Sequence, residues 1–447
     1  MWIRSWMNLK SWVISLELSE NLIRTVYENE AEREDHVLIE EILNLTQSIT
    51  DYNKYLSASK TEFKFRHHVG FIQTDNYRIQ VLPKIWKSNF QGEIYSVKNL
   101  IKLLLYAFAP PRFNVPQTDI LLEKSDFDLF DLLIRLYATS LVDQLSIGAY
   151  RRYIRNQEES KYLKGKLNIR KQINKIDQSK FDIDYFSFSS DNNLNRFFVY
   201  ATKTFRDLTR DIQNLEILSY IESILGSEKI TFINSNVRIN FNRLNQRFEI
   251  PYTYAKIILD NLLILSGNSR KAMMMLFDMN VVFERFVAKF IERNQGTIFA
   301  GMEVKELSPQ SSKRNFIYNK NGRPLRITRP DLKVTAANST YIFDTKYKIL
   351  NVPDIDENDN DNADEIGRIS PCDLYQMFTY SELYKSSATV LVFPGAKNCI
   401  SDPYQFRNNG GVLWVYMLHL DLNIEDWEDK LASEFRAHFV KIQTQAE

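Results

Sequence analysis

Apolar and polar residues alternate from Phe343 to Lys348, which is the pattern of a β-strand. Side chains of a strand point in turn to the two faces of a sheet, so Asp344 and Lys346 are expected to share one face. The strand is predicted to span residues 340–349. The carboxylate of Asp344 and the amine of Lys346 would therefore lie next to each other on one face of the sheet.

A second short run, residues 325–330, ends immediately before Asp331 and also predicts a strand. The residues Ala-Ala-Asn-Ser at positions 336–339 have the composition of a turn. We therefore expect the run before Asp331 to pair with the strand over residues 340–349. This pairing would bring Asp331 close to Asp344 and Lys346.

Apolar and polar residues at helical spacing predict a helix before these strands and another after them. Residues 279–290 place three phenylalanines on one helix face, and Glu284 borders that face. Gln376 and Tyr380 are four residues apart, which puts them on one side of a later helix. They are candidates for binding substrate or bracing the lysine, or they form a partly buried polar pair. With a further strand predicted at residues 388–394, residues 271–447 are expected to form an α/β domain with a mixed sheet.

The rest of the chain divides into two regions of different periodicity. Residues 1–115 are expected to form a β-rich domain, with strand-like runs at 63–66 and 77–82, a hairpin over 69–85 and one helical stretch near 37–56. Residues 116–270 are expected to be mainly helical, with helices near 126–145, 194–225 and 254–265. Pro110 and Pro111 mark the break between the two regions. The fold class predicted is an α+β multidomain protein.

Composition agrees with a folded protein of two or three domains, at 447 residues, 44% hydrophobic and 25% charged. The formal net charge is only +1, so any contact with DNA must come from local patches. Residues 151–180 hold ten Lys or Arg against three acidic residues, with Tyr153 and Tyr162 among them. This stretch is either a DNA-facing patch or a solvated helical surface with a loop.

Several classes of site are excluded by the residues present. Cys372 and Cys399 form neither a metal-binding spacing nor a disulfide framework, and the adjacent His67 and His68 point apart, so no zinc site is expected. Residues 354–365 hold seven acids but lack the glycine of a calcium loop, and a solvated insertion is expected. With no run of eighteen apolar residues and no signal peptide, we expect no membrane span and a cytoplasmic location.

Two carboxylates and a lysine at one place have a specific chemical use. Asp331 and Asp344 can hold a hard cation such as Mg²⁺ through oxygen ligands, and Glu284 is a candidate third ligand. Lys346 can orient or help to deprotonate an attacking water. That is the chemistry of metal-dependent phosphodiester cleavage, although surface salt bridges would give the same spacing.

The order of these elements resembles the core of the PD-(D/E)xK nuclease superfamily, in the RecB-like branch that carries Gln-x-x-x-Tyr. Further short segments resemble the McrC family, the nuclease subunits of McrBC-type restriction systems that act on DNA containing 5-methylcytosine. The segments are Gly70-Phe71-Ile72, Arg329-Pro330-Asp331 and residues 79–85, 163–167, 191–196, 283–287, 344–348 and 373–376. The resemblance covers residues 60 to 400.

This resemblance implies more than the spacing shows. Asp331, Asp344 and Lys346 would handle Mg²⁺ and water, with Gln376 and Tyr380 as accessory residues of the site. The expected substrate is double-stranded DNA, and the expected partner is a McrB-like AAA+ GTPase hexamer that the chain joins and stimulates through its N-terminal domain. Dimerisation through the nuclease domain is a further expectation. The chain lacks a G-x-x-x-x-G-K-[ST] motif, so the NTPase is assigned to the partner.

Two other functions fit the same residues. The chain could be a non-catalytic activator of the AAA+ GTPase with a vestigial nuclease fold, or a RecB-like DNA-repair nuclease that acts on ends. The intact set of Asp331, Asp344 and Lys346 favours an active endonuclease. The reader of the DNA target is expected on the partner.

Overall fold

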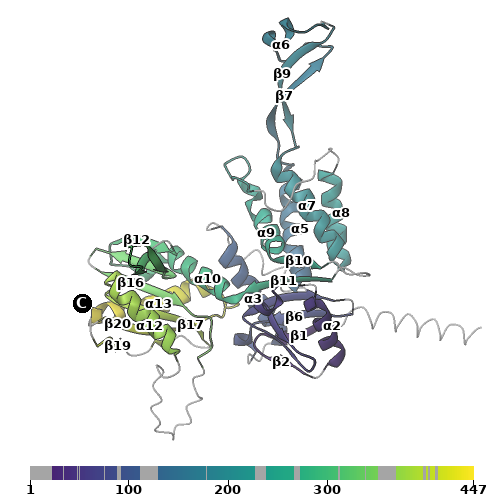
Figure 1. The fold of residues 1–447 in the computed structure, drawn as a ribbon. Helices are drawn as coiled ribbons and strands as arrows, with labels where there is room; N and C mark the ends of the chain where they lie inside the picture. Colours follow the sequence, from purple (N-terminus) through teal and green to yellow (C-terminus); the bar gives the residue numbers. More distant parts are fainter. Residues whose placement is uncertain are drawn as a thin grey trace, which may run out of the picture. The chain divides into compact units, whose positions relative to one another are not determined.

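The computed structural model describes residues 23–446, except positions 34, 48, 50, 75, 178 and 338 and residues 88–91, 111–128, 227–237, 266–271, 311–312, 351–368, 396–398, 401–402 and 408–410. The elements group into two compact units: unit 1 combines Met1–Pro116 with Leu263–Glu447, and unit 2 is Gln117–Leu262 (Figure 1). The acidic stretch at 354–365 and the N-terminal segment lie outside the described residues. Among the described helices, none has both the length and the apolar character needed to cross a membrane.

The N-terminal part of unit 1 is built on a five-stranded sheet with the order β1-β6-β5-β11-β10. Its strands are β1 (Ile23–Tyr27), β5 (His68–Gln73), β6 (Arg78–Leu82), β10 (Leu262–Leu265) and β11 (Ala272–Asp278). The predicted hairpin is formed by β5 and β6, which pair antiparallel. One apolar core joins this sheet to helix α2 (His36–Gln47) and to the small sheet of β2 (Ala31–Glu32), β3 (Leu56–Ala58) and β4 (Phe63–Phe65). The helix expected over residues 37–56 therefore ends early, and its last residue starts a strand.

Strand β11 lies far from this sheet in sequence but pairs antiparallel with β5, with Leu276 opposite Gly70. Gly70 has a φ of +147°, and a Cβ there would lie 2.0 Å from the carbonyl oxygen of Met275. Only glycine allows this approach of the two backbones. Residues 272–278 thus complete the N-terminal sheet, whereas we expected them in the α/β domain. Their uninterrupted apolar run predicts burial but does not identify the sheet that buries it.

A second sheet forms the C-terminal part of unit 1, with the order β12-β15-β16-β17-β20-β18 and with β19 paired to β20. The strands are β12 (Val304–Pro309), β15 (Leu332–Ala336), β16 (Thr340–Thr345), β17 (Ala388–Gly395), β18 (Cys399–Ile400), β19 (Tyr404–Gln405) and β20 (Val412–His419). The β15–β16 pair is antiparallel, while β16–β17 and β17–β20 are parallel. The sheet is therefore mixed, as predicted.

Helices cover both faces of this sheet, and the alternation along β16 follows from that. Phe343 packs against Phe435 and Phe439 of α13 (Trp427–Ala446) on one face. Ile342 shares a core with Met377 of α12 (Pro371–Tyr384) on the other. Because neighbouring residues of a strand face opposite ways, Asp344 points to the α12 face. The predicted alternation from residue 343 is correct.

The strand expected before Asp331 has a different partner. Residues 324–328 form β14 (Pro324–Thr328), which pairs with β13 (Arg314–Tyr318) in a separate two-stranded sheet. The strand that pairs with β16 is β15, which begins directly after Asp331. The predicted pairing was therefore wrong, although a hairpin does precede residue 340, where the Ala336 N–H donates to the carbonyl of Ser339 at 2.9 Å. Pro330 cannot donate a ladder hydrogen bond, which separates the two strands at this point.

Unit 2 is a group of helices with a long hairpin. The helices are α5 (Leu129–Ile147), α7 (Asn193–Leu208), α8 (Ile212–Leu225) and α9 (Glu249–Asn261), so the helix expected over 254–265 gives way to β10. Residues 151–180 are not a helical surface: β7 (Arg152–Ser160) pairs with β9 (Phe181–Ser189), joined by β8 (Lys166–Leu167) and the short α6 (Ile169–Ile173) (Figure 1). Acids of β9 partly neutralise the basic stretch, since Asp184 pairs with Arg155 and Asp182 with Lys175.

Candidate functional site

Strand β16 and the residue just beyond it carry the first two groups of the site. Asp344 is 1% exposed and points to α12. Lys346 follows the strand, and its backbone N–H donates to the carbonyl of Val392 at 2.9 Å, which keeps the chain extended beside β17. The Nζ of Lys346 lies 2.7 Å from Oδ2 of Asp344. The period of two predicted from the sequence thus brings this carboxylate and this amine into contact.

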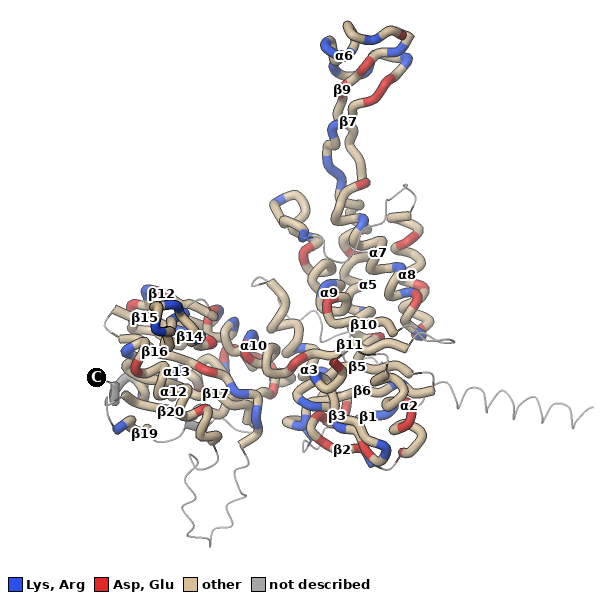
Figure 2. The backbone as a smooth tube through the Cα atoms, viewed as in Figure 1, with Lys and Arg blue, Asp and Glu red and all other residues tan. Residues whose placement is uncertain are grey.

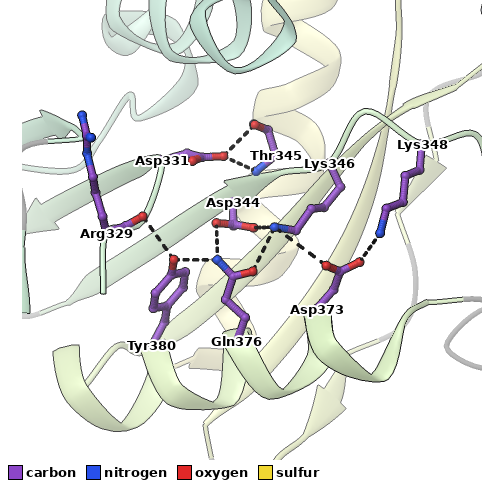
Figure 3. A network of polar contacts seen from close by, with 9 residues as sticks. All are labelled: Arg329, Asp331, Asp344, Thr345, Lys346, Lys348, Asp373, Gln376 and Tyr380. Atoms are coloured by element: carbon purple, nitrogen blue, oxygen red, sulfur yellow. Dashed lines mark hydrogen bonds and ion pairs between the residues drawn. The ribbon is translucent and has the colours of Figure 1, made fainter. Parts of the chain in front are cut away.

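Asp331 approaches the same point from the start of β15. Its Oδ2 accepts hydrogen bonds from the backbone N–H and the hydroxyl of Thr345, at 2.7 and 2.6 Å. Thr345 lies between Asp344 and Lys346, so these two bonds fix Asp331 against the strand end that carries the other two groups. The side chains lie together in Figure 3.

Helix α12 closes the site with an ordered set of polar contacts. The amide oxygen of Gln376 accepts from Lys346 Nζ at 2.9 Å, and its Nε2 donates to the hydroxyl of Tyr380 at 2.7 Å (Figure 3). The same Nε2 lies 3.4 Å from Oδ1 of Asp344. The Tyr380 hydroxyl donates to the carbonyl of Arg329 at 3.1 Å. Gln376 therefore holds the lysine and the aspartate at once.

Asp373 is a fourth acid of the site that our sequence analysis did not single out. Its Oδ1 lies 3.8 Å from Lys346 Nζ, and its Oδ2 lies 2.8 Å from Lys348 Nζ. Asp373 precedes Gln376 by three residues and Tyr380 by seven, so helical spacing places all three on one face. That spacing was the available signal.

Burial and mutual repulsion perturb the carboxylates. Burial, followed by the charge of Asp331, raises the pKa of Asp344 to about 7. Burial also raises the pKa of Asp331, although the hydrogen bonds from Thr345 oppose this. For Lys346, burial lowers the pKa, but the nearby acids Asp344, Asp373 and Asp331 together outweigh burial, and the net direction is upward. The lysine is therefore an ammonium at neutral pH.

Glu284 lies beside the pair on α10 (Met279–Arg293). Burial, then the charge of Asp331, raises the pKa of Glu284 to about 7, and Asp344 adds to the shift. Its Oε1 accepts a hydrogen bond from the side-chain amide of Gln310, whose backbone carbonyl accepts from Arg329 Nε at 2.9 Å. Glu284 is thus in electrostatic reach of both aspartates and is held by Gln310.

These residues fit a divalent cation bound by two carboxylates. Oδ2 of Asp344 is buried, and the partner described for it is the ammonium of Lys346 at 2.7 Å. No group of three His, Cys, Asp or Glu side chains in the described part of the chain is arranged to hold a metal, so Glu284 does not complete a three-ligand cluster. Mg²⁺ commonly binds through one or two carboxylates and keeps several waters, which Asp331 and Asp344 can satisfy.

A buried contact ties the site to the N-terminal sheet. The hydroxyl of Tyr347, the residue after Lys346, donates to Oε1 of Glu28 at 2.6 Å. Glu28 follows β1, is fully buried, and has its pKa raised by burial to about 7. No local pattern could reveal this contact, because 319 residues separate its partners.

The structure brings together the five residues that we singled out as catalytic candidates: Asp331, Asp344, Lys346, Gln376 and Tyr380 (Figure 3). Glu284 lies beside them. Our sequence analysis missed the support from Asp373 and from Glu28, and only Asp373 had a signal in the sequence.

No curated protein matches the sequence. The chain is similar in structure to one in a refined half-complex from a tetradecameric assembly of Thermococcus gammatolerans McrB AAA+ hexamers with bound McrC, with a TM-score of 0.64, 21% identity and coverage of 94% of this chain and 100% of that chain. It also matches a chain of the cryo-EM structure of the Thermococcus gammatolerans McrBC complex, with a TM-score of 0.49, 25% identity and coverage of 61% and 88%.

The similarity to the chain of the half-complex, at 21% identity, shows a shared fold. The family is given by a model described as "McrBC 5-methylcytosine restriction system component", which matches residues 63–394. This span contains the N-terminal hairpin, the hairpin of unit 2 and every residue of the candidate site except Glu28. Because the match extends over well more than half of the sequence, the chain belongs to the McrBC 5-methylcytosine restriction system component family.

Proposed function

We propose that the chain is the DNA endonuclease subunit of a modification-dependent restriction system and cuts phosphodiester bonds with Mg²⁺. The observation that carries the proposal is the convergence of Asp331, Asp344 and Lys346 on one point, with Gln376 bonded to the lysine at 2.9 Å. The element order around them resembles that expected of a PD-(D/E)xK nuclease, which supports the proposal, and family membership supplies the restriction context. A cytoplasmic location is part of the proposal.

Asp331 and Asp344 would hold the metal. When bound, Mg²⁺ supplies charge stabilisation at the phosphate and a more acidic water. Burial, and then the charge of Asp331, raise the pKa of Asp344. Without a cation, the neighbouring positive charge is therefore too small to keep both carboxylates ionised at neutral pH. Metal binding and ionisation of this pair are therefore coupled.

Lys346 has a role that differs from that of a general base. Its pKa is raised by Asp344 despite burial, so the ammonium keeps its proton at neutral pH. A charged lysine donates hydrogen bonds, which orients the attacking water and offsets charge on the phosphate. Gln376 fixes the ammonium through its amide oxygen, and Tyr380 fixes the amide in turn. This arrangement limits the lysine to one position before substrate binds.

The proposed partner is an AAA+ GTPase. The structurally similar chain comes from an assembly of McrB AAA+ hexamers with bound McrC, which supports the same kind of assembly here. We expected docking through residues 1–115. The hairpin of β7 and β9 is a second candidate surface, because Tyr153, Phe186 and Phe188 are all more than half exposed on it.

Two alternatives remain distinct from this proposal: a non-catalytic activator of the GTPase, and a repair nuclease that acts on DNA ends. The intact Asp331, Asp344 and Lys346 oppose the first. Incubation of the chain and its AAA+ partner with GTP and closed circular plasmid distinguishes all three. Cleavage of methylated plasmid in Mg²⁺ and not in EDTA supports the proposal. GTPase stimulation without cleavage supports the activator, and cleavage restricted to linear DNA supports the repair nuclease.

A further inference from the structure

The β13–β14 hairpin has no packed face. Every residue from Arg314 to Ile327 is exposed, apart from a partly exposed Asn319 in the turn. The turn is ordered by its own bonds: Gly322 N–H donates to the Asn319 carbonyl at 3.0 Å, and Gly322 has a φ of +74°. The strands pair antiparallel with two irregularities of register. A two-stranded ribbon with both faces in solvent is marginal alone and gains stability from a partner.

The charge on this ribbon has one sign. Residues 313–329 contain six Lys or Arg and no Asp or Glu, in a chain whose net charge is +1. The side chains of Lys313, Lys320, Arg323 and Arg326 form no ion pair or hydrogen bond with the described residues. Lys and Arg gather along the segment near β14 in Figure 2. This differs from the hairpin of unit 2, where Asp182 and Asp184 neutralise part of the basic charge.

Apolar side chains stand between these cations. Phe316, Ile317, Tyr318, Leu325 and Ile327 are between 42% and 58% exposed. Ile317 lies opposite Arg326 in the register, so an apolar and a cationic side chain are neighbours across the ribbon. Such a mixture suits a surface that contacts phosphates and presents apolar groups to bases.

The ribbon is anchored to the helix of the candidate site. The Arg314 guanidinium donates to the carbonyl of Leu383 and lies 5.0 Å from the ring centre of Tyr384, at the end of α12. Thr328 Oγ1 lies 3.1 Å from the Tyr384 hydroxyl. Three residues after Thr328 the chain reaches Asp331. The ribbon therefore emerges directly beside the candidate metal ligands.

We propose that the β13–β14 ribbon binds duplex DNA next to the cut site, with its cations on the phosphates and its strands along a groove. The proposal rests on the proposed nuclease function and names the surface that holds its substrate. A two-stranded β-ribbon fits the major groove. Bringing the duplex beside Asp331 positions a phosphodiester bond at the site.

The test measures DNA binding by the full chain without cleavage. Fluorescence anisotropy of a 20-base-pair duplex in EDTA at several KCl concentrations gives the Kd and its salt dependence for the unaltered chain and for R323A/R326A. The matched control is K430A/K441A, which removes the same charge from exposed positions of α13. Loss of two phosphate contacts weakens binding roughly 10- to 100-fold near 0.1 M salt and lowers the salt slope by about 1.8. A second variant, Y318S/I327S, should weaken binding without changing the slope.

Each other outcome overturns the proposal. One is an unaltered chain that does not bind the duplex at 50 mM KCl, and another is equal loss of affinity in R323A/R326A and in the control. A third is unchanged DNA binding with a shift from dimer to monomer in light scattering, which would assign the ribbon to self-association. Since binding is measured in EDTA, these results do not depend on whether the site cuts. Failure of nuclease activity with normal ribbon-dependent binding would refute the proposed function alone.

Discussion

Replacing Asp344 with Asn should stabilise the metal-free protein, which is the opposite of what loss of a structural salt bridge would do. Burial and the charge of Asp331 raise the pKa of Asp344 from 3.8 to about 7. A difference of about 3 units corresponds to about 4 kcal/mol at 1.36 kcal/mol per unit. Because Asp331 shares the repulsion, we expect Asp344→Asn to raise the free energy of unfolding by about 2–4 kcal/mol at pH 8 in EDTA.

The effect of Asp344→Asn on the unfolding free energy should depend on pH in a definite direction. The folded-state pKa of Asp344 is raised, so the stability contributed by its proton is full below about pH 4 and is lost as pH rises through about 7. Lowering the pH from 7 to 5 should therefore reduce the gain in unfolding free energy of Asp344→Asn by more than about 0.5 kcal/mol per pH unit. The matched control is Asp191→Asn, since Arg196 lowers the pKa of Asp191. That substitution should reduce stability at pH 8.

The assay is hydrogen exchange of β16 peptides as a function of urea, which follows the unit that contains the site. Mg²⁺ should stabilise the unaltered protein and should stabilise the Asp344→Asn variant less. If Asp344 served only as the ion-pair partner of Lys346, its loss would leave a buried charge and destabilise the fold by about 3–5 kcal/mol. A destabilised variant in EDTA at pH 8 would refute the reasoning.

Three further predictions follow from contacts outside the metal pair. Gln376→Leu removes the acceptor that holds Lys346, so plasmid cleavage by the assembled complex should fall about 10- to 100-fold while GTPase stimulation is unchanged; equal loss of both would contradict this. Glu28→Gln should flatten the stability profile between pH 4.5 and about 7, where the raised pKa of Glu28 makes the unaltered protein lose up to about 3 kcal/mol; an unchanged denaturation profile would oppose it. Gly70→Ala should cost at least about 3 kcal/mol or abolish folding, because its Cβ meets Met275 O at 2.0 Å; a normal urea midpoint would count against the β5–β11 pairing.

The candidate site was predictable where it depends on short-range periodicity. The period of two along residues 343–346 placed Asp344 and Lys346 on one face of a strand. The four-residue spacing placed Gln376 and Tyr380 on one face of a helix. Both arrangements are present, and they meet because α12 covers the face of β16 to which Asp344 points. Helical spacing held the same information for Asp373.

The parts that the sequence did not reveal depend on long-range pairing. Residues 325–330 alternate like a strand, but alternation does not specify the partner, and they pair with β13 instead of β16. The apolar run of β11 likewise joins a sheet about two hundred residues earlier in the chain. Residues 181–189 alternate between apolar and polar residues on each side of a break at Tyr185 and Phe186, which was a missed signal for β9 and for the hairpin of unit 2.

The most direct test of the nuclease account is cleavage of closed circular methylated plasmid by the chain assembled with its AAA+ partner, in GTP and Mg²⁺. The measurement compares the unaltered chain with Asp344→Asn and Lys346→Ala, and GTPase stimulation is recorded in the same reactions. The account predicts cleavage by the unaltered complex and at least about a hundredfold loss in both variants with stimulation retained. Undiminished cleavage in either variant would contradict it.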